Sequence, residues 1–123
     1  MLDIKALLTK ILSKLYVSGS TTAGSITWTY RKYLDGTLEM WGTATTTLAI
    51  GTVSGSLYTT ASTYSIAMPS FVNAIDFITA ELSGGGWADI TDFNNPPYLR
   101  LYAPTSYGSA SRTLRYHMIG TWT

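Results

Sequence analysis

The first sixteen residues, MLDIKALLTKILSKLY, carry apolar side chains at three- and four-residue spacing. This spacing places the apolar side chains on one face of an α-helix and the polar ones on the other. We therefore expect an N-terminal amphipathic helix over residues 1–16. Its apolar face would consist of Ile4, Leu7, Leu8, Ile11, Leu12 and Leu15.

The same segment also fits a heptad seam, with Met1, Leu8 and Leu15 at position a and Ile4 and Ile11 at position d. Leucine at a with isoleucine at d favours three- or four-stranded coiled coils over two-stranded ones. Two heptads are too short to hold a bundle unaided, because helix nucleation is costly. One interpretation is therefore a helix packed on the core of its own domain. The other is an oligomerisation helix that needs help from the globular part.

Residues 17–25, VSGSTTAGS, consist mostly of Gly, Ser and Thr. Segments of this composition behave as flexible linkers. A helix docked on its own domain would not require so loose a tether, so the linker favours the oligomerisation helix, which we expect to form a trimeric coiled coil.

From residue 26 onward apolar and polar residues alternate, the pattern of a β-strand with two different faces. The runs ITWTYRKYL and TLEMWGTATTTLAI flank Asp35-Gly36. This dipeptide predicts a two-residue type I′ turn, because both residues tolerate positive φ. The two runs should therefore form a β-hairpin in which Arg31 or Lys32 faces Glu39.

Turn clusters (SGSL, MPSF, SGGG, NNPP and APTSYGSAS) divide the rest of the chain into short segments. Short strands spaced by roughly ten residues are typical of an antiparallel sandwich. We expect residues 26–123 to form a mainly β, jelly-roll-like sandwich head. The further predicted strands are Thr63–Ala67, Ala74–Leu82, Trp87–Ile90, Tyr98–Tyr102 and Thr113–Thr121.

The composition limits the classes of partner. Charged residues make up 12% of the 123 residues, about half the usual share, and the net charge is +1. Because the eight basic residues are scattered, we expect no nucleic-acid partner. No apolar run reaches the ~20 residues of a membrane span, and charged residues interrupt the first fifteen, so we expect no membrane partner and no signal peptide. The low charge also indicates that partner subunits cover part of the surface.

Motifs for catalysis are missing from the sequence. It contains no cysteine and no nucleophile elbow, zinc-protease or P-loop motif. The one histidine, His117, lies in an alternating run, where a half-buried structural role is the usual one. Asp89 and Asp92 are the best carboxylate pair for glycoside hydrolysis or for a calcium ion, but the EF-hand spacing is absent. We therefore expect that the protein is not an enzyme and that it binds neither a metal ion nor a cofactor.

Binding chemistry is better represented, in the segment SGGGWADITDFNNPPY. An aromatic face packs on the C–H side of a pyranose, and Asp and Asn side chains pair with hydroxyl groups. This segment therefore predicts a carbohydrate site. Alternatively, Trp87 plugs the end of the sandwich and the aspartates cap turns, or the aromatics bury against neighbouring subunits. The candidate ligand-binding residues are Trp87, Asp89, Asp92, Asn94, Asn95 and Tyr98.

Most of Ile26–Thr123 resembles a known group of proteins. The segment ITWTYRKYLDGTLEMWGTAT resembles the pattern W-x-Y-R-K-[YW]-x-[DS]-G-x-x-E-x-W-G of short phage and prophage structural proteins from Firmicutes-type hosts. It is also similar to the C-terminal domains of phage tail fibres. The likeness continues through GSLYTTASTYSIAMPSFVNAIDFITAEL and ends in LRYHMIGTWT, which resembles a recurring terminal signature. The Trp87–Tyr98 stretch is matched least, so the resemblance carries over no ligand, and its pattern contains no catalytic residue.

The resemblance implies a homotrimeric virion component, released by host lysis, whose β-domain faces the host surface. Its partners would be further copies of itself, other virion proteins and a bacterial cell-surface glycan. The alternative is a purely structural head-fibre or decoration protein without a ligand, and a virion-associated glycan hydrolase is least favoured. Framework residues, which fill the core or a subunit junction or let strands pack closely, would be Trp41, Gly42, Gly120 and Trp122.

Overall fold

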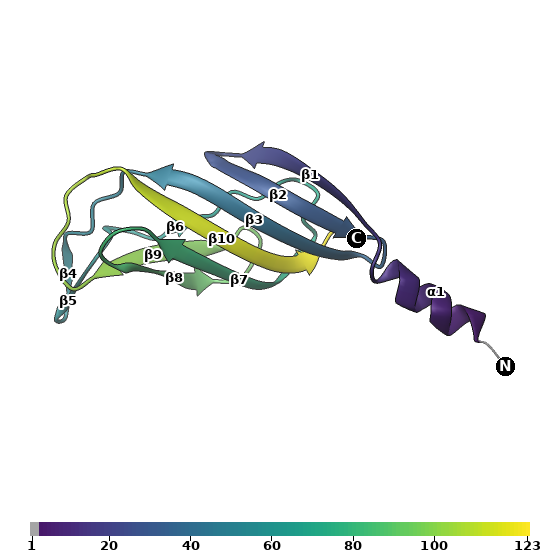
Figure 1. The fold of residues 1–123 in the computed structure, drawn as a ribbon. Helices are drawn as coiled ribbons and strands as arrows, with labels where there is room; N and C mark the ends of the chain where they lie inside the picture. Colours follow the sequence, from purple (N-terminus) through teal and green to yellow (C-terminus); the bar gives the residue numbers. More distant parts are fainter. Residues whose placement is uncertain (1–2) are drawn as a thin grey trace.

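A computed structural model describes residues 3–123, so Met1, the first predicted seam residue, lies outside the described residues. Within them, one short helix precedes ten strands (Figure 1). The prediction of a mainly β chain with antiparallel sheets and one short helix is confirmed. The elements are α1 (Ile4–Leu12), β1 (Tyr16–Ala23), β2 (Ile26–Tyr33), β3 (Thr37–Thr46), β4 (Thr52–Ser54), β5 (Leu57–Thr59), β6 (Tyr64–Ser65), β7 (Ala74–Leu82), β8 (Trp87–Asp92), β9 (Tyr98–Ala103) and β10 (Arg112–Thr121).

Two antiparallel sheets face each other, an arrangement consistent with a β-sandwich (Figure 1). The larger sheet has the order β1-β2-β3-β10-β7. The smaller sheet has the order β4-β5-β9-β6, and β8 pairs with β9 as an outer strand. Inward-facing residues alternate with solvent-facing ones along the long strands, for example in β10, and this alternation builds the core between the sheets.

The centre of the core is organised around Trp28. Its side chain is fully buried, and its indole Nε1 donates a hydrogen bond to the carbonyl of Ala67, 3.0 Å away, on the opposite side of the sandwich. Its ring lies over Gly42, the residue opposite it on β3. A Cβ at Gly42 would lie 2.7 Å from two atoms of that ring, so the glycine is required by close packing.

The predicted hairpin between β2 and β3 is confirmed, and Arg31 lies directly opposite Glu39. The prediction of a two-residue type I′ turn is wrong. Three residues, 34–36, connect the strands, and of these only Gly36 has a positive φ, of 97°. The Asp35 carboxylate instead accepts a hydrogen bond from the backbone N–H of Thr37 at 2.9 Å, which stabilises the longer loop.

The prediction of a flexible linker over residues 17–25 is also wrong. Residues 16–23 form β1, which pairs residue for residue with β2 at the edge of the larger sheet. The two strands are joined by a tight turn in which Gly24 has a φ of 57°. Backbone hydrogen bonds to β2 order this segment, and its short polar side chains suit a strand with a solvent-facing side.

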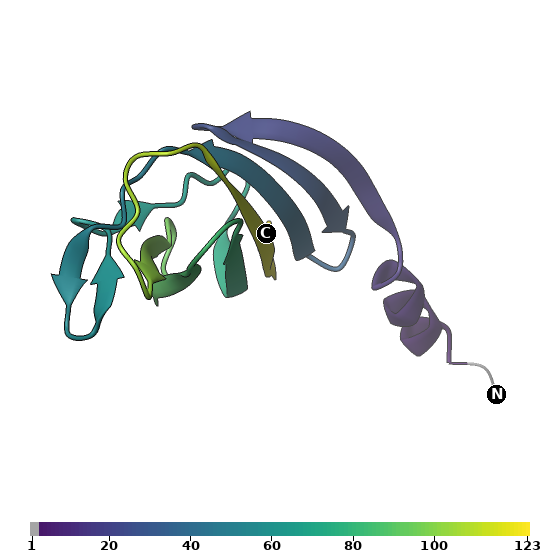
Figure 2. The ribbon, with the colours of Figure 1, turned by 60° about the vertical axis from the view of Figure 1, so that its left-hand side comes forward.

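The N-terminal helix is confirmed but is shorter than predicted. It begins after Asp3, whose carboxylate accepts a hydrogen bond from the N–H of Ala6, and it ends at Leu12, so that Leu15 lies outside it. No residue of α1 is buried. Figures 1 and 2 show the helix extending away from the end of the sandwich. The interpretation of a helix packed on its own core is therefore wrong.

Candidate functional site

The β8–β9 hairpin places several of the predicted ligand-binding residues on the outer face of the smaller sheet. Trp87 and Asp89 are exposed on β8, whereas the residues between and after them turn toward the core. On β9, Tyr98, Arg100 and Tyr102 face outward and alternate with buried residues. Directly opposed residues of an antiparallel pair share a face. Trp87 therefore lies beside Tyr102, and Asp89 lies beside Arg100.

Trp87 and Tyr102 form a stacked aromatic pair. Their ring centroids are 6.0 Å apart and their planes differ by 15°. Trp87 is 43% exposed. In the described part of the chain β8 pairs only with β9, so Trp87 lies on an edge strand of the smaller sheet. Its exposed part is a flat apolar surface of the kind that packs against the C–H side of a sugar ring.

Arg100 supplies a fixed cationic donor next to this pair. Its Nε and one terminal nitrogen donate hydrogen bonds to the carbonyl of Thr60 at 3.3 and 3.2 Å. The exposed carboxylate of Asp89 lies opposite it on β8. Donors and acceptors are thus placed beside an aromatic surface, as hydroxyl recognition requires. Arg100 was missing from the predicted set, although its even spacing from Tyr98 and Tyr102 places all three on one face.

The remaining candidates serve the turn between the two strands. The carboxylate of Asp92 accepts a hydrogen bond from the N–H of Asn94 at 2.9 Å, and the amide of Asn95 donates to the carbonyl of Val72 at 3.1 Å. The interpretation that the aspartates cap turns is thus confirmed for Asp92. Asp92 lies five strand residues from Trp87, roughly 16 Å at ~3.3 Å per residue. The six predicted residues therefore do not form one site.

The Trp87 end of the hairpin lies far from α1. Tyr102 pairs with Thr59 of β5 on one side and with Trp87 of β8 on the other. The stacked pair therefore lies at the end of the molecule occupied by β4 and β5. Figure 1 shows this end opposite the end from which α1 extends. Helix and aromatic pair thus mark opposite ends of the molecule.

The apolar face of α1 is open in the single chain. Ile4 is 65% exposed and Leu8 is 53% exposed, and the other apolar residues of the helix are exposed as well. A nine-residue helix is not stable in water on its own propensity. The exposed apolar residues of α1 and its junction with β1 are Ile4, Leu7, Leu8, Ile11, Leu12 and Leu15.

A row of stacked side chains crosses the outer face of the larger sheet. The guanidinium of Arg31 lies 4.9 Å from the Tyr16 ring centroid and 5.2 Å from that of Trp41. His117 stacks on Trp41 from the next strand, with centroids 5.6 Å apart, and its Nε2 lies 3.1 Å from a carboxylate oxygen of Glu39. A hydrogen bond with Tyr33 and the nearby Tyr16 raise the pKa of Arg31 above its ordinary value.

The position of Trp41 in this row differs from the position expected for a core residue. Of the two roles expected for Trp41, filling the core is wrong, because the residue is 37% exposed on the outer face, and filling a subunit junction stays a prediction. Since β3 lies between β2 and β10, Arg31 and His117 contact Trp41 from opposite sides. Two side chains of the same chain therefore engage this indole. His117 has the half-buried, structural position that was expected.

Gly120 and Trp122 have framework roles, as Gly42 does. Gly120 lies at an irregularity in the pairing of β10 with β7, and a Cβ there would collide with the carbonyl oxygen of Ala74. The indole Nε1 of Trp122 donates to the carbonyl of Tyr33 at 2.8 Å, and its ring packs against the core. These residues join the C-terminal end to the neighbouring strands.

The structure also bears on metal binding and on membranes. Among residues 3–123, no three His, Asp or Glu side chains are grouped closely enough to hold a metal ion. None of the helices in the same range is long and apolar enough to cross a membrane.

No protein-family model, no curated protein and no solved structure matches the chain. The resemblance to phage structural proteins therefore stays a prediction.

Proposed function

We propose that this chain is a phage virion fibre or receptor-binding protein: a homotrimer, held together through α1, that binds host cell-surface carbohydrate with its β-domain. The observation that carries the proposal is the apolar stripe of α1, which is exposed along its whole length and extends away from the sandwich. The likeness of Ile26–Thr123 to phage structural proteins supports the same assignment.

The trimer follows from the chemistry of the stripe. Burying an apolar side chain contributes roughly 1.5–3 kcal/mol, and none of the α1 residues is buried within the described part of the chain. Leu8 at an a position and Ile4 and Ile11 at d positions favour more than two strands. The short bundle needs help from the heads, because two heptads alone are marginal.

Carbohydrate binding is assigned to the outer face of the β8–β9 hairpin. Trp87 offers a partly exposed indole stacked on Tyr102, and Asp89 and Arg100 offer an acceptor and a donor beside it. This surface lies at the end of the molecule opposite α1, where a fibre would meet its receptor. Each site would bind weakly, and three copies on one trimer would raise the avidity.

The trimer is tested by sedimentation equilibrium of the full chain at micromolar concentration. We expect wild type to be a trimer and Leu8→Gln/Ile11→Gln to be a monomer, because two seam residues become polar without loss of helix propensity. The matched control is Thr9→Gln/Lys10→Gln, which changes the opposite side of α1 and should stay trimeric. A monomeric wild type, or a trimeric seam variant, would refute this assembly.

Carbohydrate binding is tested on a glycan array with the wild-type trimer. We expect binding that Trp87→Ala abolishes and that Trp41→Ala retains, since both residues are exposed tryptophans but the ring of Trp41 is already engaged by Arg31 and His117. Urea unfolding of both variants checks that they are folded. An array without signal, or equal loss in both variants, contradicts the glycan assignment.

A purely structural head-fibre or decoration protein is the second candidate. The observation in its favour is the row on the outer face of the larger sheet, where Arg31 and His117 both stack on Trp41. Such a preformed, rigid face suits packing against another virion protein better than recognition of a sugar. A silent array together with attachment of the protein to purified capsids would favour this candidate.

A further inference from the structure

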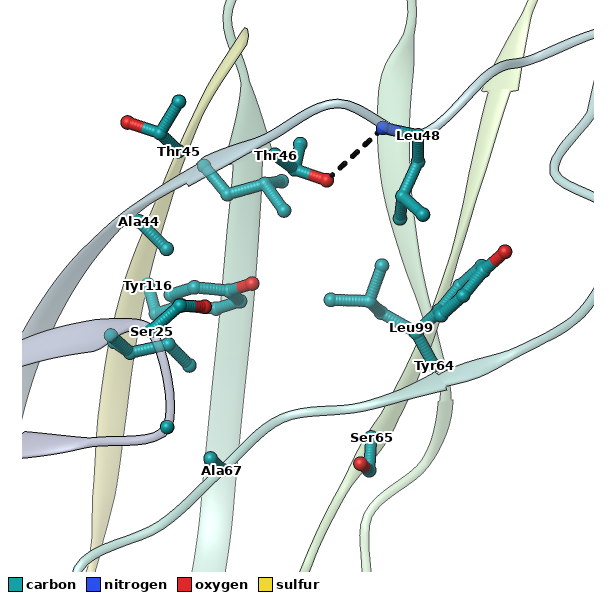
Figure 3. Close-up of a pocket in the computed structure, with 13 residues that line it drawn as sticks. Ser25, Ala44, Thr45, Thr46, Leu48, Tyr64, Ser65, Ala67, Leu99 and Tyr116 are labelled. Carbon is teal, nitrogen blue, oxygen red and sulfur yellow. Dashed lines mark hydrogen bonds between the residues drawn. The ribbon is translucent and has the colours of Figure 1, made fainter. Parts of the chain in front are cut away.

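A cavity of about 310 Å³ opens between the two sheets, away from the β8–β9 hairpin face and from α1 (Figure 3). One wall is formed by β2, β3 and β10 of the larger sheet, and the other by β6 and β9 of the smaller sheet. The buried side chains of Ile26, Leu99 and Leu114 make its inner surface mainly apolar.

Short side chains keep this space open. Ser25 and Ala44 line it from the larger sheet, and Ser65 and Ala67 line it from the opposite side. The space is partly open to solvent and is not a void enclosed in the core. A cavity of about 150 Å³ lined by apolar side chains binds benzene. The present cavity has roughly twice that volume, enough for a bicyclic aromatic molecule.

Tyr116 provides a polar group inside the cavity. Its side chain is 94% buried, since only 6% of it is exposed, and Figure 3 shows its hydroxyl pointing into the space between the sheets. No buried side-chain nitrogen or oxygen among the described residues lacks a hydrogen-bond partner, so this hydroxyl, for which no protein partner is found, is reached by solvent through the opening of the cavity. Burial raises the pKa of Tyr116 to about 12, so the hydroxyl keeps its proton and can donate at neutral pH.

The position of the Tyr116 ring is fixed by the core. It packs against Trp28 with ring centroids 5.7 Å apart, and Trp28 is itself held by its hydrogen bond to the carbonyl of Ala67. The position of the hydroxyl oxygen is therefore fixed. A ligand that met it would lose little freedom in the protein on binding, which favours recognition.

We propose that this cavity is a binding site for a small, mainly apolar molecule of bicyclic size that accepts one hydrogen bond from the Tyr116 hydroxyl. The apolar walls bind the body of the molecule, and the hydroxyl, which can exchange a water for the ligand, selects for a carbonyl or ether oxygen. Thr46 and Ser65 are also among the lining residues and add polar character to the rim of the cavity. This site requires neither the trimer nor the glycan surface.

The test uses the full chain with two probes, 2-acetylnaphthalene and naphthalene, titrated while the methyl resonances of Ile26, Leu99 and Leu114 are followed by NMR. We expect both probes to shift these resonances, and the ketone to bind about 3- to 10-fold more tightly because it pairs with the Tyr116 hydroxyl. Tyr116→Phe should remove this preference and leave naphthalene binding unchanged. Ala44→Leu fills the cavity and should abolish binding of both.

Two results would overturn the proposal. One is the absence of methyl shifts up to the solubility limit of both probes, which would mean a cavity filled only by solvent. The other is an unchanged preference for the ketone in Tyr116→Phe. If Ala44→Leu does not fold, Ala67→Leu fills the cavity from the opposite wall. None of these readouts depends on the oligomeric state or on Trp87, so failure here is distinct from failure of the proposed function.

Discussion

The packing of Trp28 on Gly42 leads to a sharp prediction for the variant Gly42→Ala. The added Cβ would lie 2.7 Å from ring atoms Cε3 and Cζ3 of Trp28 and 2.9 Å from Cγ2 of Ile26. Carbon atoms in good contact lie about 3.5–4.0 Å apart, so the methyl group is roughly 1 Å too close to three atoms. The ring and the strand cannot both keep their positions.

The size of the effect depends on what can move. Trp28 is fully buried, and retreat of its ring would break the hydrogen bond from Nε1 to the carbonyl of Ala67. Gly42 itself lies on β3, which is paired on both sides by β2 and β10. Overpacking of a core typically costs about 1–3 kcal/mol, and with both partners fixed we expect a loss of about 2–3 kcal/mol in the free energy of unfolding.

The measurement is urea unfolding followed by tryptophan fluorescence. It is made in the Leu8→Gln/Ile11→Gln background at fixed protein concentration, because association would make the midpoint depend on concentration. With a slope of about 1–3 kcal/mol per molar urea, the midpoint should fall by about 0.7–3 M. The control is Gly51→Ala, whose Cβ would meet only the Ser106 hydroxyl at 3.4 Å and should change stability by less than about 0.5 kcal/mol. Equal stability of the two variants would refute the packing argument.

Two further predictions concern Tyr116 and the β8–β9 turn. In the folded chain the pKa of Tyr116 is about 12, against 10.0 for an unperturbed tyrosine, so the unfolded state loses this proton first and stability falls as the pH rises from about 10 to about 12. The decline amounts to about 3 kcal/mol, and urea midpoints at several pH values should show it to be absent from Tyr116→Phe; parallel profiles would contradict this. Asn95→Ala should cost about 1 kcal/mol, because the carbonyl of Val72 loses its donor, whereas Asn94→Ala should be close to neutral in thermal unfolding. Equal effects of the two would show that the Asn95 bond contributes nothing.

The sequence predicted the strands whose side chains alternate most clearly. β2, β3, β7 and β10 bury one face each, so their apolar periodicity is strong and their bounds lie close to those expected. β4 and β5 were missed. They are three residues each, no residue of β4 is buried, and their pairing depends on a turn at Gly55. Strands this short leave too little periodicity to detect.

The candidate site was predicted only in part, for a chemical reason. Asp and Asn occur both in sites that recognise hydroxyl groups and in turns, where their side chains form hydrogen bonds with nearby backbone groups. Asp92 and Asn95 serve the turn, whereas Asp89 lies exposed on the strand face. Residue type alone does not separate these uses. The register of β8 with β9 does, because it decides which side chains lie beside Trp87.

Residues 17–25 are not the flexible linker that the sequence predicted, and this affects how the heads would be held in an assembly through α1. With a flexible linker, three heads would be free to reorient around a helical bundle. Instead β1 follows α1 after three residues, and the carbonyl of Leu15 accepts a hydrogen bond from the N–H of Leu34 at 2.9 Å, which ties the junction to the β2–β3 loop. Leu15, Val17 and Leu34 are 48%, 60% and 47% exposed at this junction. In the proposed trimer these side chains would continue the apolar surface of α1 onto the head and supply the contacts that so short a helix lacks.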